Sequence, residues 1–468
     1  MQIGDNMQYI DFNCPKKVHF TGIGGISMSG FAELLIKKGF TVTGSDWKET
    51  PITERLEELG AKVAYGTQKA SNVPGDADLL IYTAAVKADN PELLEADRLN
   101  IPKIERADLV GDVMLHFKHN YSIAGTHGKT TTTSMLSLVI LEAGLDPTIS
   151  VGGILAPIGG NMRIGASDNF VVESCEYCDS FLSFHPTRAI ITSIEAEHLD
   201  YFKTLENERA SYKKFAGKLP ADGLLVACTA IPDMEELFKD VSCKIITYNS
   251  TDTSADYYAT DISYNDFGQP SFTLMNKGKA LGHIDLKVMG EHNVANAVAV
   301  AAMALNSGIS LDTVKAALLK YTGTGRRFEI KGSIGGVTVV DDYAHHPTEI
   351  ATTLKAAARY PHKTLWTVFQ PHTYSRTAAF KHDFAEALSH ADKIVLTDIY
   401  AARETNTFGI SSEDICDILK NEYGKDVYHF SSFDEIVTFL LQNCSTGDLL
   451  ITMGAGDVVK IGETLLGK

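Results

Sequence analysis

Hydrophobic and polar residues alternate along the first part of the chain in a pattern that predicts short buried strands separated by amphipathic helices. Val18–Phe20 is typical of a strand, a glycine-rich turn follows, and Ile26–Lys38 has the apolar spacing of a helix. Phe40–Thr43 predicts a second strand that ends near Asp46, and Leu79–Thr83 predicts another. Strands that alternate with helices favour right-handed βαβ units and therefore a parallel sheet.

The middle of the chain combines two kinds of strand pattern. His119–Ala124 predicts a short strand that leads through a glycine loop into a long helix. Phe170–Val172 and Ala189–Thr192 are continuous apolar or β-branched runs, as expected of buried parallel strands. Tyr257–Val288 alternates with turn residues and predicts an antiparallel meander, which the alanine-rich helix Val294–Leu305 would close.

The last part of the chain again alternates strand and helix. Its predicted strands are Val337–Val340, Leu365–Phe369, Ile394–Thr397, Val427–Phe430 and Leu449–Thr452. A chain of 468 residues is too long for one ordinary core. We therefore expect an α/β protein of three domains: a Rossmann-like domain at 1–117, a central domain with a mixed sheet at 118–322, and a second Rossmann-like domain at 323–468.

Composition narrows the class of protein. Hydrophobic residues make up 44% and charged residues 22% of the chain, which is typical of a globular protein. The formal net charge of −17 disfavours a nucleic-acid partner. We find neither a signal-peptide pattern nor an apolar run of about 18 residues, so we expect no membrane insertion. Seven scattered cysteines fit a reducing cytoplasm, and packing is the favoured role for the lone pair Cys175 and Cys178.

A glycine loop at 125–130 has the context of a phosphate-binding loop, because it lies between a predicted strand and a predicted helix. Glycines let the backbone N–H groups point inward, and the helix N-terminus adds positive potential. Lys129 would reach the β- and γ-phosphates, and Thr130 would offer a hydroxyl to Mg²⁺. Two residues separate the glycines instead of the usual four, so a plain turn with a surface lysine is the alternative. The run Thr130–Thr133 argues against that alternative, because threonine has poor helix propensity.

A second glycine turn follows the first predicted strand. Gly22-Ile23-Gly24-Gly25 is similar to the fingerprint of dinucleotide-binding proteins, and Asp46 lies where a carboxylate binds a ribose hydroxyl. A glycine turn followed by such a carboxylate requires only that the ligand have a pyrophosphate and a ribose. Both NAD(P) and a UDP-sugar have these groups. A tight turn without a ligand is the alternative.

These two loops, in this order, resemble the Mur ligase family, and the resemblance covers essentially the whole chain. The matching segments are His19–Gly30, Gly125–Thr131, Glu195–Asp200, Gly290–Asn296, Gly325–Phe328, Asp341–Glu349 and Gln370–Thr377. The last two segments resemble the alanine-adding members of the family.

The resemblance implies ATP-dependent ligation of L-alanine to the carboxylate of UDP-N-acetylmuramate through an acyl phosphate, with ATP and Mg²⁺ as cofactors. This reaction belongs to peptidoglycan synthesis, and through it to cell wall biogenesis, cell shape and the cell division cycle. The first domain would hold the UDP-sugar, the central one ATP, and the last one the amino acid. The oligomeric state is left open.

The resemblance also implies a role for individual residues. The catalytic residues would be Lys129, Glu173, His198, His345, His372 and Arg376. ATP would contact Gly125, Thr126, His127, Gly128, Lys129, Thr130, Thr131, His292, Asn293, Asn296, Arg327 and Asp341. The UDP-sugar would contact Gly22, Ile23, Gly24, Gly25, Asp46 and Thr83. The amino acid would contact Tyr343, His345, His372 and Arg376. Mg²⁺ would be held by Thr130, Glu173 and His198.

Several of the central-domain assignments have alternatives. Glu173 ends a strand opposite Thr130, which suits a pair of Mg²⁺ ligands, whereas His198 is an unusual ligand for a hard cation and could be a hydrogen-bonded residue at a strand end. Asn293 could simply cap a helix. Lys213 lies where some family members carry a carbamylated lysine, but we expect a solvated lysine. Cys175 and Cys178 replace acidic residues of the family pattern.

The C-terminal assignments follow from the chemistry of an amino acid substrate. The guanidinium of Arg376 could clamp its carboxylate, and a neutral His345 or His372 could orient the amine or remove its proton. Both histidines follow predicted strands and would share one edge of a sheet, where α/β proteins bind ligands, although core histidines are the alternative. We expect Arg326 at the surface.

Three other functions compete with the ligase hypothesis. The first is an NAD(P)-dependent oxidoreductase, which would leave Lys129 and the histidine loops without a role. The second is a non-catalytic phosphate-loop switch. The third is a Mur-type ligase that recycles murein tripeptide.

Overall fold

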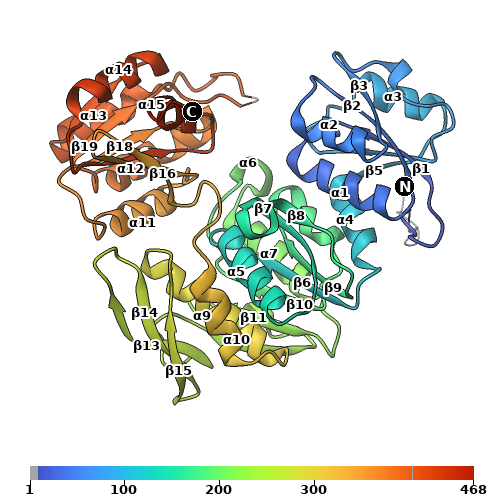
Figure 1. The fold of residues 1–468 in the computed structure, drawn as a ribbon, viewed down its shortest axis with the longest axis horizontal. Helices are drawn as coiled ribbons and strands as arrows, with labels where there is room; N and C mark the ends of the chain where they lie inside the picture. The colour runs from blue at the N-terminus through green and yellow to red at the C-terminus, as the bar shows by residue number, and fades with distance from the viewer. Residues whose placement is uncertain (1–8, 403) are drawn as a thin grey trace. The chain divides into compact units, whose positions relative to one another are not determined.

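The computed structural model describes residues 9–402 and 404–468 and is an α/β protein with three sheets (Figure 1). The chain divides into two compact units. The first contains the chain through Thr247 together with Ala302–Ile309, and the second contains Tyr248–Ala301 and Ser310–Lys468. The α/β class and the three sheets confirm the fold expected from the sequence, whereas the domain limits near 117 and 323 stay predictions. Within the described residues, no helix is long and apolar enough to cross a bilayer.

The N-terminal sheet is parallel throughout, in the order β3-β2-β1-β4-β5. Its elements are β1 (Lys17–Thr21), α1 (Ile26–Lys37), β2 (Thr41–Asp46), α2 (Pro51–Glu58), β3 (Lys62–Tyr65), η1 (Ala70–Asn72), β4 (Leu79–Tyr82), α3 (Pro91–Arg98), β5 (Lys103–Glu105) and α4 (Arg106–Met114). The strand order reverses between β1 and β4. Open parallel sheets bind ligands at the carboxyl ends of the strands beside such a reversal, which is where the first glycine turn leaves β1.

The central sheet places β6 in its middle. Its elements in the first unit are β6 (His119–Ala124), α5 (Lys129–Glu142), β7 (Thr148–Leu155), η2 (Ala156–Ile158), β8 (Gly160–Arg163), β9 (Asn169–Glu173), η3 (Tyr177–Ser183), β10 (Arg188–Ile191), α6 (Leu199–Phe202), α7 (Leu205–Ala216), β11 (Leu224–Cys228), α8 (Met234–Phe238) and β12 (Lys244–Tyr248). β6 pairs in parallel with β9 on one side and β10 on the other. Because all three strands are almost completely buried, the loops at their carboxyl ends are held on a rigid base.

The predicted meander is confirmed. β13 (Tyr257–Tyr264), β14 (Pro270–Asn276) and β15 (Lys279–Asp285) pair antiparallel, and α9 (Glu291–Asn306) and α10 (Leu311–Lys320) follow them. α9 confirms the predicted alanine-rich helix and starts three residues earlier than the apolar pattern does.

The C-terminal sheet has the order β16-β17-β21-β18-β19-β20, with β16 antiparallel and the others parallel. Its elements are β16 (Glu329–Ile334), β17 (Val337–Asp342), α11 (Pro347–Ala357), β18 (Leu365–Phe369), α12 (Tyr374–Leu388), β19 (Lys393–Leu396), α13 (Ser412–Tyr423), β20 (Asp426–His429), α14 (Phe433–Asn443), β21 (Leu449–Met453) and α15 (Val459–Leu465). Apolar clusters cover both faces. β17 and β18 flank β21 in parallel, so the loops that follow them meet at one edge.

Candidate active site

The phosphate-type loop between β6 and α5 has, at two positions, a left-handed backbone that favours glycine. Gly125 has φ +136° and Gly128, at the N-cap of α5, has φ +81°. A Cβ at Gly125 would lie 2.0 Å from Oγ1 of Thr192. The loop is tied to the end of β10, because Thr126 N donates to the carbonyl of Ser193 at 3.0 Å. The loop therefore wraps at the N-terminus of a 14-residue helix, where N–H groups lack helical acceptors and favour an anion.

Lys129 is the cation of this loop. Its Nζ donates to the carbonyls of Gly125 and Thr126, at 2.5 and 3.1 Å, and lies 3.0 Å from Oε2 of Glu176. Burial is the largest single influence and lowers the pKa of Lys129, but the charges of Glu176, Cys175, Glu197 and Glu173 together outweigh it, so the pKa ends above its ordinary value. Lys129 is therefore charged at neutral pH and held where the loop would receive phosphate.

Thr130 and Glu173 form a pair beside the loop, as the sequence predicts. The hydroxyl of Thr130 donates to Oε1 of Glu173 at 3.0 Å, and Gly152 N donates to Oε2 at 2.7 Å. A Cβ at Gly152 would lie 2.5 Å from this carboxylate, so the glycine makes room for it. A hydroxyl next to a carboxylate at the end of a phosphate loop is an oxygen donor set that suits Mg²⁺.

A second group of metal-type ligands lies at Glu176, Glu197 and His198, whose ligand atoms are all within 4.8 Å of one another. Glu176 is fully buried, and its Oε1 lies 3.7 Å from Nε2 of His198. The other Glu176 oxygen, Oε2, is also buried, and its neighbour is the Lys129 ammonium at 3.0 Å. His198 has φ +52°, an uncommon value for histidine that aims its ring at this group.

The predicted Mg²⁺ ligands are therefore divided between two groups. Thr130 and Glu173 form one, and His198 belongs to the other, together with two carboxylates. Neither carboxylate was predicted as a ligand, although an acid directly before a histidine at a strand end is a signal that could have identified Glu197. Lys213 lies apart, with 44% of its side chain exposed and an ion pair to Asp240 at 2.7 Å, which confirms the expectation of a solvated lysine.

Glu208 supports this group from α7 and was not predicted either. Its Oε2 accepts the backbone N–H of Glu197 at 3.1 Å. Burial, reinforced by the nearby carboxylates of Glu176 and Glu197, raises the pKa of Glu208 to about 8. The Glu208 carboxyl is therefore mostly protonated at pH 7, so it positions Glu197 without adding a full negative charge.

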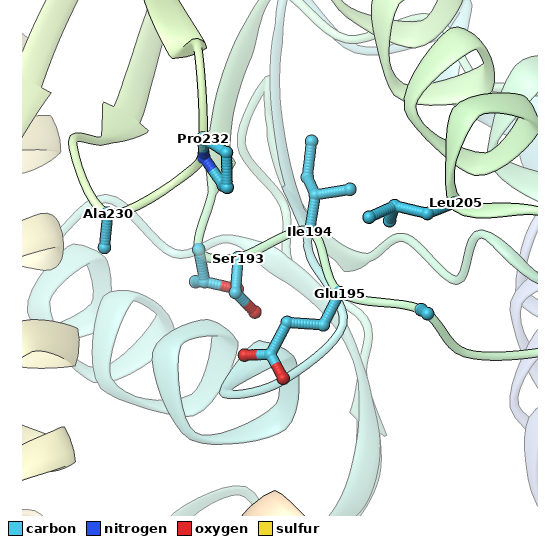
Figure 2. Close-up of a pocket in the computed structure, with 8 residues that line it drawn as sticks. Ser193, Ile194, Glu195, Leu205, Ala230 and Pro232 are labelled. Carbon is cyan, nitrogen blue, oxygen red and sulfur yellow. The ribbon is translucent and has the colours of Figure 1, made fainter.

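A cavity of about 340 Å³ opens beside the phosphate loop, at the carboxyl ends of β10 and β11 (Figure 2). Its lining residues are Thr192, Ser193, Ile194, Glu195, Ala196, Leu205, Ala230 and Pro232. Figure 2 shows the carboxylate of Glu195 projecting from the loop after β10, with Ala230 and Pro232 on a neighbouring loop. The cavity shares a wall with the phosphate loop, since His127 N donates to Oγ of Ser193 at 3.0 Å.

The first glycine turn is built by hydrogen bonds to the end of β2. Gly22 N and Ile23 N both donate to the carbonyl of Ser45 at 2.9 Å. Gly24 N donates to Oδ2 of Asp46 at 2.7 Å, and a Cβ at Gly24 would lie 2.8 Å from that oxygen. Asp46 thus braces the turn, in addition to any contact with a ribose. Gly25 follows as the N-cap of α1 and accepts the amide of Ser29.

Arg106 is a cation at this turn that was not predicted from the sequence. It begins α4 directly after β5, and its Nη1 donates to Oγ of Ser27 in the first turn of α1 at 3.0 Å. A guanidinium beside a helix N-terminus is suited to bind a pyrophosphate. Thr83 directly follows β4 at the same edge of the sheet and is half-buried.

The three residues near the start of α9 that were predicted to contact ATP differ in how far they are buried. His292 is exposed, whereas Asn293 and Asn296 are buried. Asn293 lies inside the first turn of α9, and its amide donates to the carbonyl of Met289 at 2.7 Å. Asn296 donates to Oδ1 of Asn293 at 3.1 Å. The helix-capping alternative for Asn293 is therefore wrong, because its side-chain oxygen accepts from an amide side chain and not from a helix N–H group.

Arg326 is not the surface residue expected from the sequence. Its guanidinium donates to Oδ2 of Asp341 at 2.9 Å and to the carbonyls of Gly454 and Gly456 at 2.7 and 3.2 Å. Asp341 is fully buried, and its other oxygen accepts the hydroxyl of Thr452 at 2.7 Å. A buried carboxylate attracts the nearest cation into the fold, so Arg326 connects β17 to the loop after β21.

Arg327 lies beside Tyr343 and Glu349. Its guanidinium carbon lies 5.4 Å from the ring centre of Tyr343 and its Nη1 lies 3.9 Å from Oε1 of Glu349. These contacts leave about a third of the side chain exposed, which a residue that contacts a substrate requires.

The loops after β17 and β18 bring the predicted amino-acid residues together. The rings of His345 and His372 have centres 6.0 Å apart, and Tyr343 lies 5.4 Å from His345. Nη1 of Arg376 donates to Nδ1 of His372 at 3.3 Å, and Tyr400 stacks on His372 with an interplanar angle of 15°. Burial lowers the pKa of His372 to about 4, assisted by the neighbouring His345 and the guanidinium of Arg376, so its ring is neutral at pH 7.

Comparison with known proteins places all three parts of the chain in one family. Residues 17–118 match the catalytic domain of the Mur ligase family, residues 123–304 match the Mur ligase middle domain, and residues 326–456 match the glutamate ligase domain of Mur ligases.

Curated relatives and solved structures agree with these matches. A UDP-N-acetylmuramate–L-alanine ligase of Lachnoclostridium phytofermentans is 56% identical over 99% of this chain and 100% of its own length. A ligase of the same name from Acetivibrio thermocellus is 48% identical over 99% of this chain and 98% of its own.

Among solved structures, a UDP-N-acetylmuramate–alanine ligase from Thermotoga maritima has a TM-score of 0.82 at 30% identity, covering 97% of this chain and 98% of its own. A murein peptide ligase from Psychrobacter arcticus has a TM-score of 0.71 at 25% identity, with the same coverage. This likeness leaves no support for the oxidoreductase alternative. Taken with the geometry of the two glycine loops, these matches show that the chain belongs to the Mur ligase family.

Proposed function

We propose that this chain joins L-alanine to the carboxylate of UDP-N-acetylmuramate, with hydrolysis of ATP to ADP and phosphate, in the synthesis of peptidoglycan precursors. Relatives that carry the name of this reaction are 46–56% identical to the chain over nearly its full length. The structural observation that carries the proposal is the charged Lys129 on its glycine loop, with Thr130 and Glu173 paired beside it.

The chemistry explains why a phosphate loop is needed. A carboxylate is a poor acyl donor, and phosphorylation converts it into an acyl phosphate with a good leaving group. The amine then attacks the acyl carbon, and the tetrahedral intermediate collapses to the amide and inorganic phosphate. Phosphoryl transfer depends mostly on positioning and positive charge. Lys129 and the N–H groups at the start of α5 supply both at the terminal phosphates.

Two groups of side chains, one with oxygen donors alone and one with two carboxylates and a histidine, fit the Mg²⁺ that such a reaction requires. Thr130 and Glu173 would hold one ion, and Glu176, Glu197 and His198 would hold another. The fit rests on the ligand atoms themselves, including the fully buried carboxylate of Glu176. When bound, Mg²⁺ neutralises charge on the transferring phosphoryl group.

The second compact unit carries residues suited to an amino acid. Arg376 presents a planar guanidinium for the carboxylate of alanine. His372 is neutral at pH 7 and lies against Arg376, so its ring is able to accept a hydrogen bond from the amine and orient it. Tyr343 and His345 border the same place.

The test is an assay with ATP, Mg²⁺, UDP-N-acetylmuramate and L-alanine that follows ADP and the new amide together. We expect both products only when all four components are present. ADP release that is no faster than in the single-omission controls would contradict the proposal. Replacing L-alanine by murein tripeptide separates this function from that of the recycling ligase, and we expect the tripeptide to be the poorer substrate.

A further inference from the structure

Trp47 has the most exposed large apolar side chain in the described part of the chain, with 73% of its surface accessible. Single exposed apolar residues are common on protein surfaces, so exposure alone indicates nothing. The position of Trp47 is what gives it meaning. It directly follows β2, at the carboxyl edge of the N-terminal sheet, next to the first glycine turn.

The backbone of Trp47 is fixed although its side chain is in solvent. Trp47 N donates to Oδ1 of Asp46 at 2.8 Å, and Gly66 N donates to the carbonyls of both residues, at 3.1 Å for Trp47 and 3.0 Å for Asp46. The other oxygen of Asp46 accepts the amide of Gly24. One carboxylate therefore ties Trp47 to the glycine turn, and the indole has a defined place from which to project.

The parts of a nucleotide have a fixed order along such an edge. A pyrophosphate binds at the N-terminus of the helix after β1, the ribose lies at the end of β2, and the base continues past the ribose. In this chain the pyrophosphate position is α1 with Arg106, and the ribose position is Asp46. The residue after Asp46 is the one that meets the base.

We propose that the indole of Trp47 stacks on the uracil ring of the UDP-sugar and is a determinant of its binding. The inference rests on the proposed function, which puts a uridine nucleotide at this turn. Every nucleobase has a π-face that an aromatic ring covers, and stacking removes the apolar surface of both rings from water. Ile26, 58% exposed at the start of α1, extends the apolar border of the same turn.

The chain has two tryptophans, which makes the contact directly observable. Trp366 is 1% exposed and its Nε1 donates to Asp448, so a ligand at the N-terminal turn does not reach it. We expect UMP to quench the emission of the full-length protein and to shield it from acrylamide. AMP at the same concentration should do neither. The Trp47→Phe protein emits from Trp366 alone. Any loss of its signal on addition of UMP measures absorption of light by the nucleotide, and beyond that its emission should not change.

Substitutions at Trp47 separate stacking from simple apolar cover. Trp47→Ala should weaken UMP binding about 5- to 150-fold, the range that corresponds to loss of one base–aromatic stack. It should raise KM for the UDP-sugar by a similar factor, with a much smaller effect on kcat. Trp47→Phe should retain most of the affinity, whereas Trp47→Leu, apolar but without a π-face, should lose most of it. Leu94→Ala removes another exposed apolar side chain, 54% accessible, from α3 and should change nothing.

The possible outcomes distinguish failure of the stacking contact from failure of the proposed ligase function. Native UMP affinity in both Trp47→Ala and Trp47→Leu, measured by calorimetry, would overturn the stacking contact while leaving the ligase proposal intact. Absence of any UMP binding to the native protein would defeat the proposed function itself. If Trp47→Ala does not fold, as judged by the emission of Trp366, the comparison of Trp47→Leu with Trp47→Phe decides the question alone.

Discussion

Lys129 is the residue on which phosphate binding depends most directly. Lys129→Ala should lower kcat for ADP formation by at least about 100-fold, because it removes a charge that acts on the transferring phosphoryl group. Binding of UMP, measured by calorimetry, should survive, since the first glycine turn does not use this lysine.

Lys213→Ala is the matched control for Lys129→Ala. Lys213 lies on the same unit, but its partner is the exposed Asp240, so turnover should stay within about twofold of native. Loss of UMP binding together with turnover in Lys129→Ala would mean that the variant is misfolded or that the roles of the two loops are wrong.

His372 predicts a pH dependence of stability in the second unit. Its pKa is about 4 in the folded chain and about 6.5 in an unfolded one, so the unfolded chain binds more protons between these values. The contribution of His372 is therefore fully favourable above about pH 6.5 and is lost as the pH falls towards 4. His372→Gln should flatten this part of the curve, as followed by denaturant unfolding with Trp366 emission. An unchanged slope would contradict the shifted pKa.

At the scale of single residues, the sequence predicted those site residues that can be identified from the spacing within one segment. The pair Thr130 and Glu173 follows from a phosphate loop and the end of a neighbouring strand. Arg106 could not be predicted in this way, because its partner Ser27 is 79 positions away and the two meet only through the sheet order. Arg326 was misjudged for the same reason: the buried Asp341 that draws it inward is adjacent only in the fold.

Among the elements, α4 shows how tightly a helix is packed at one glycine. A Cβ at Gly111 would lie 2.1 Å from the carbonyl oxygen of Ser183 in η3. Gly→Ala inside a helix normally gains about 1 kcal/mol, but here a backbone atom would have to move, which costs about 1–3 kcal/mol or more. Gly111→Ala should therefore lower the free energy of unfolding.

Gly75→Ala is the control for Gly111→Ala, because a Cβ added at Gly75 would have nothing within 4 Å and the φ of this residue is not positive. Thermal unfolding of the two variants side by side measures the difference. Equal melting temperatures for Gly111→Ala and the native protein would show that α4 and η3 separate more easily than their contact suggests.

Burial on both faces helped a strand to be predicted but did not ensure it, since the fully buried β11 was missed and the partly exposed meander was found. β9, β10 and β18 each contain a continuous apolar or β-branched run, and such runs can be recognised without knowing the partner strand. β3, β5 and β12 were not predicted either, nor were β7, β8 and β16. β7 contains two glycines and shifts register against β8, while β16 alternates exposed and half-buried residues along an antiparallel edge. These strands are defined by the neighbour with which they pair, which local pattern does not record.

For the whole molecule, the division into two compact units predicts how a ligand changes stability. UMP bound to the first unit should stabilise that unit by about 2.7 kcal/mol at a concentration 100 times its Kd. In the Trp47→Phe protein, the transition followed through Trp366 in the second unit should move less than the one that calorimetry assigns to the first. Equal shifts would mean that the units unfold as one.

The alanine-rich helix α9 was predicted from the sequence, but its place in the whole molecule was not. Its existence follows from its composition, and it was expected to close the central region. In the structure, the division between the units falls within it, after Ala301. Helical periodicity identifies a helix and its apolar face, but not which neighbours that face contacts.

The contact between Lys129 and Glu176 has a consequence for how nucleotide and metal bind. If a bound phosphate draws the Lys129 ammonium away, the buried carboxylate of Glu176 is left without a counter-ion. Breaking such a buried ion pair costs about 3–5 kcal/mol. A divalent ion on Glu176 cancels that cost. Nucleotide and ion should therefore show positive thermodynamic linkage, each tightening the other by the same factor, and chelator-treated protein should bind ATP far more weakly. Glu176→Gln, which has no charge to strand, should weaken that mutual dependence.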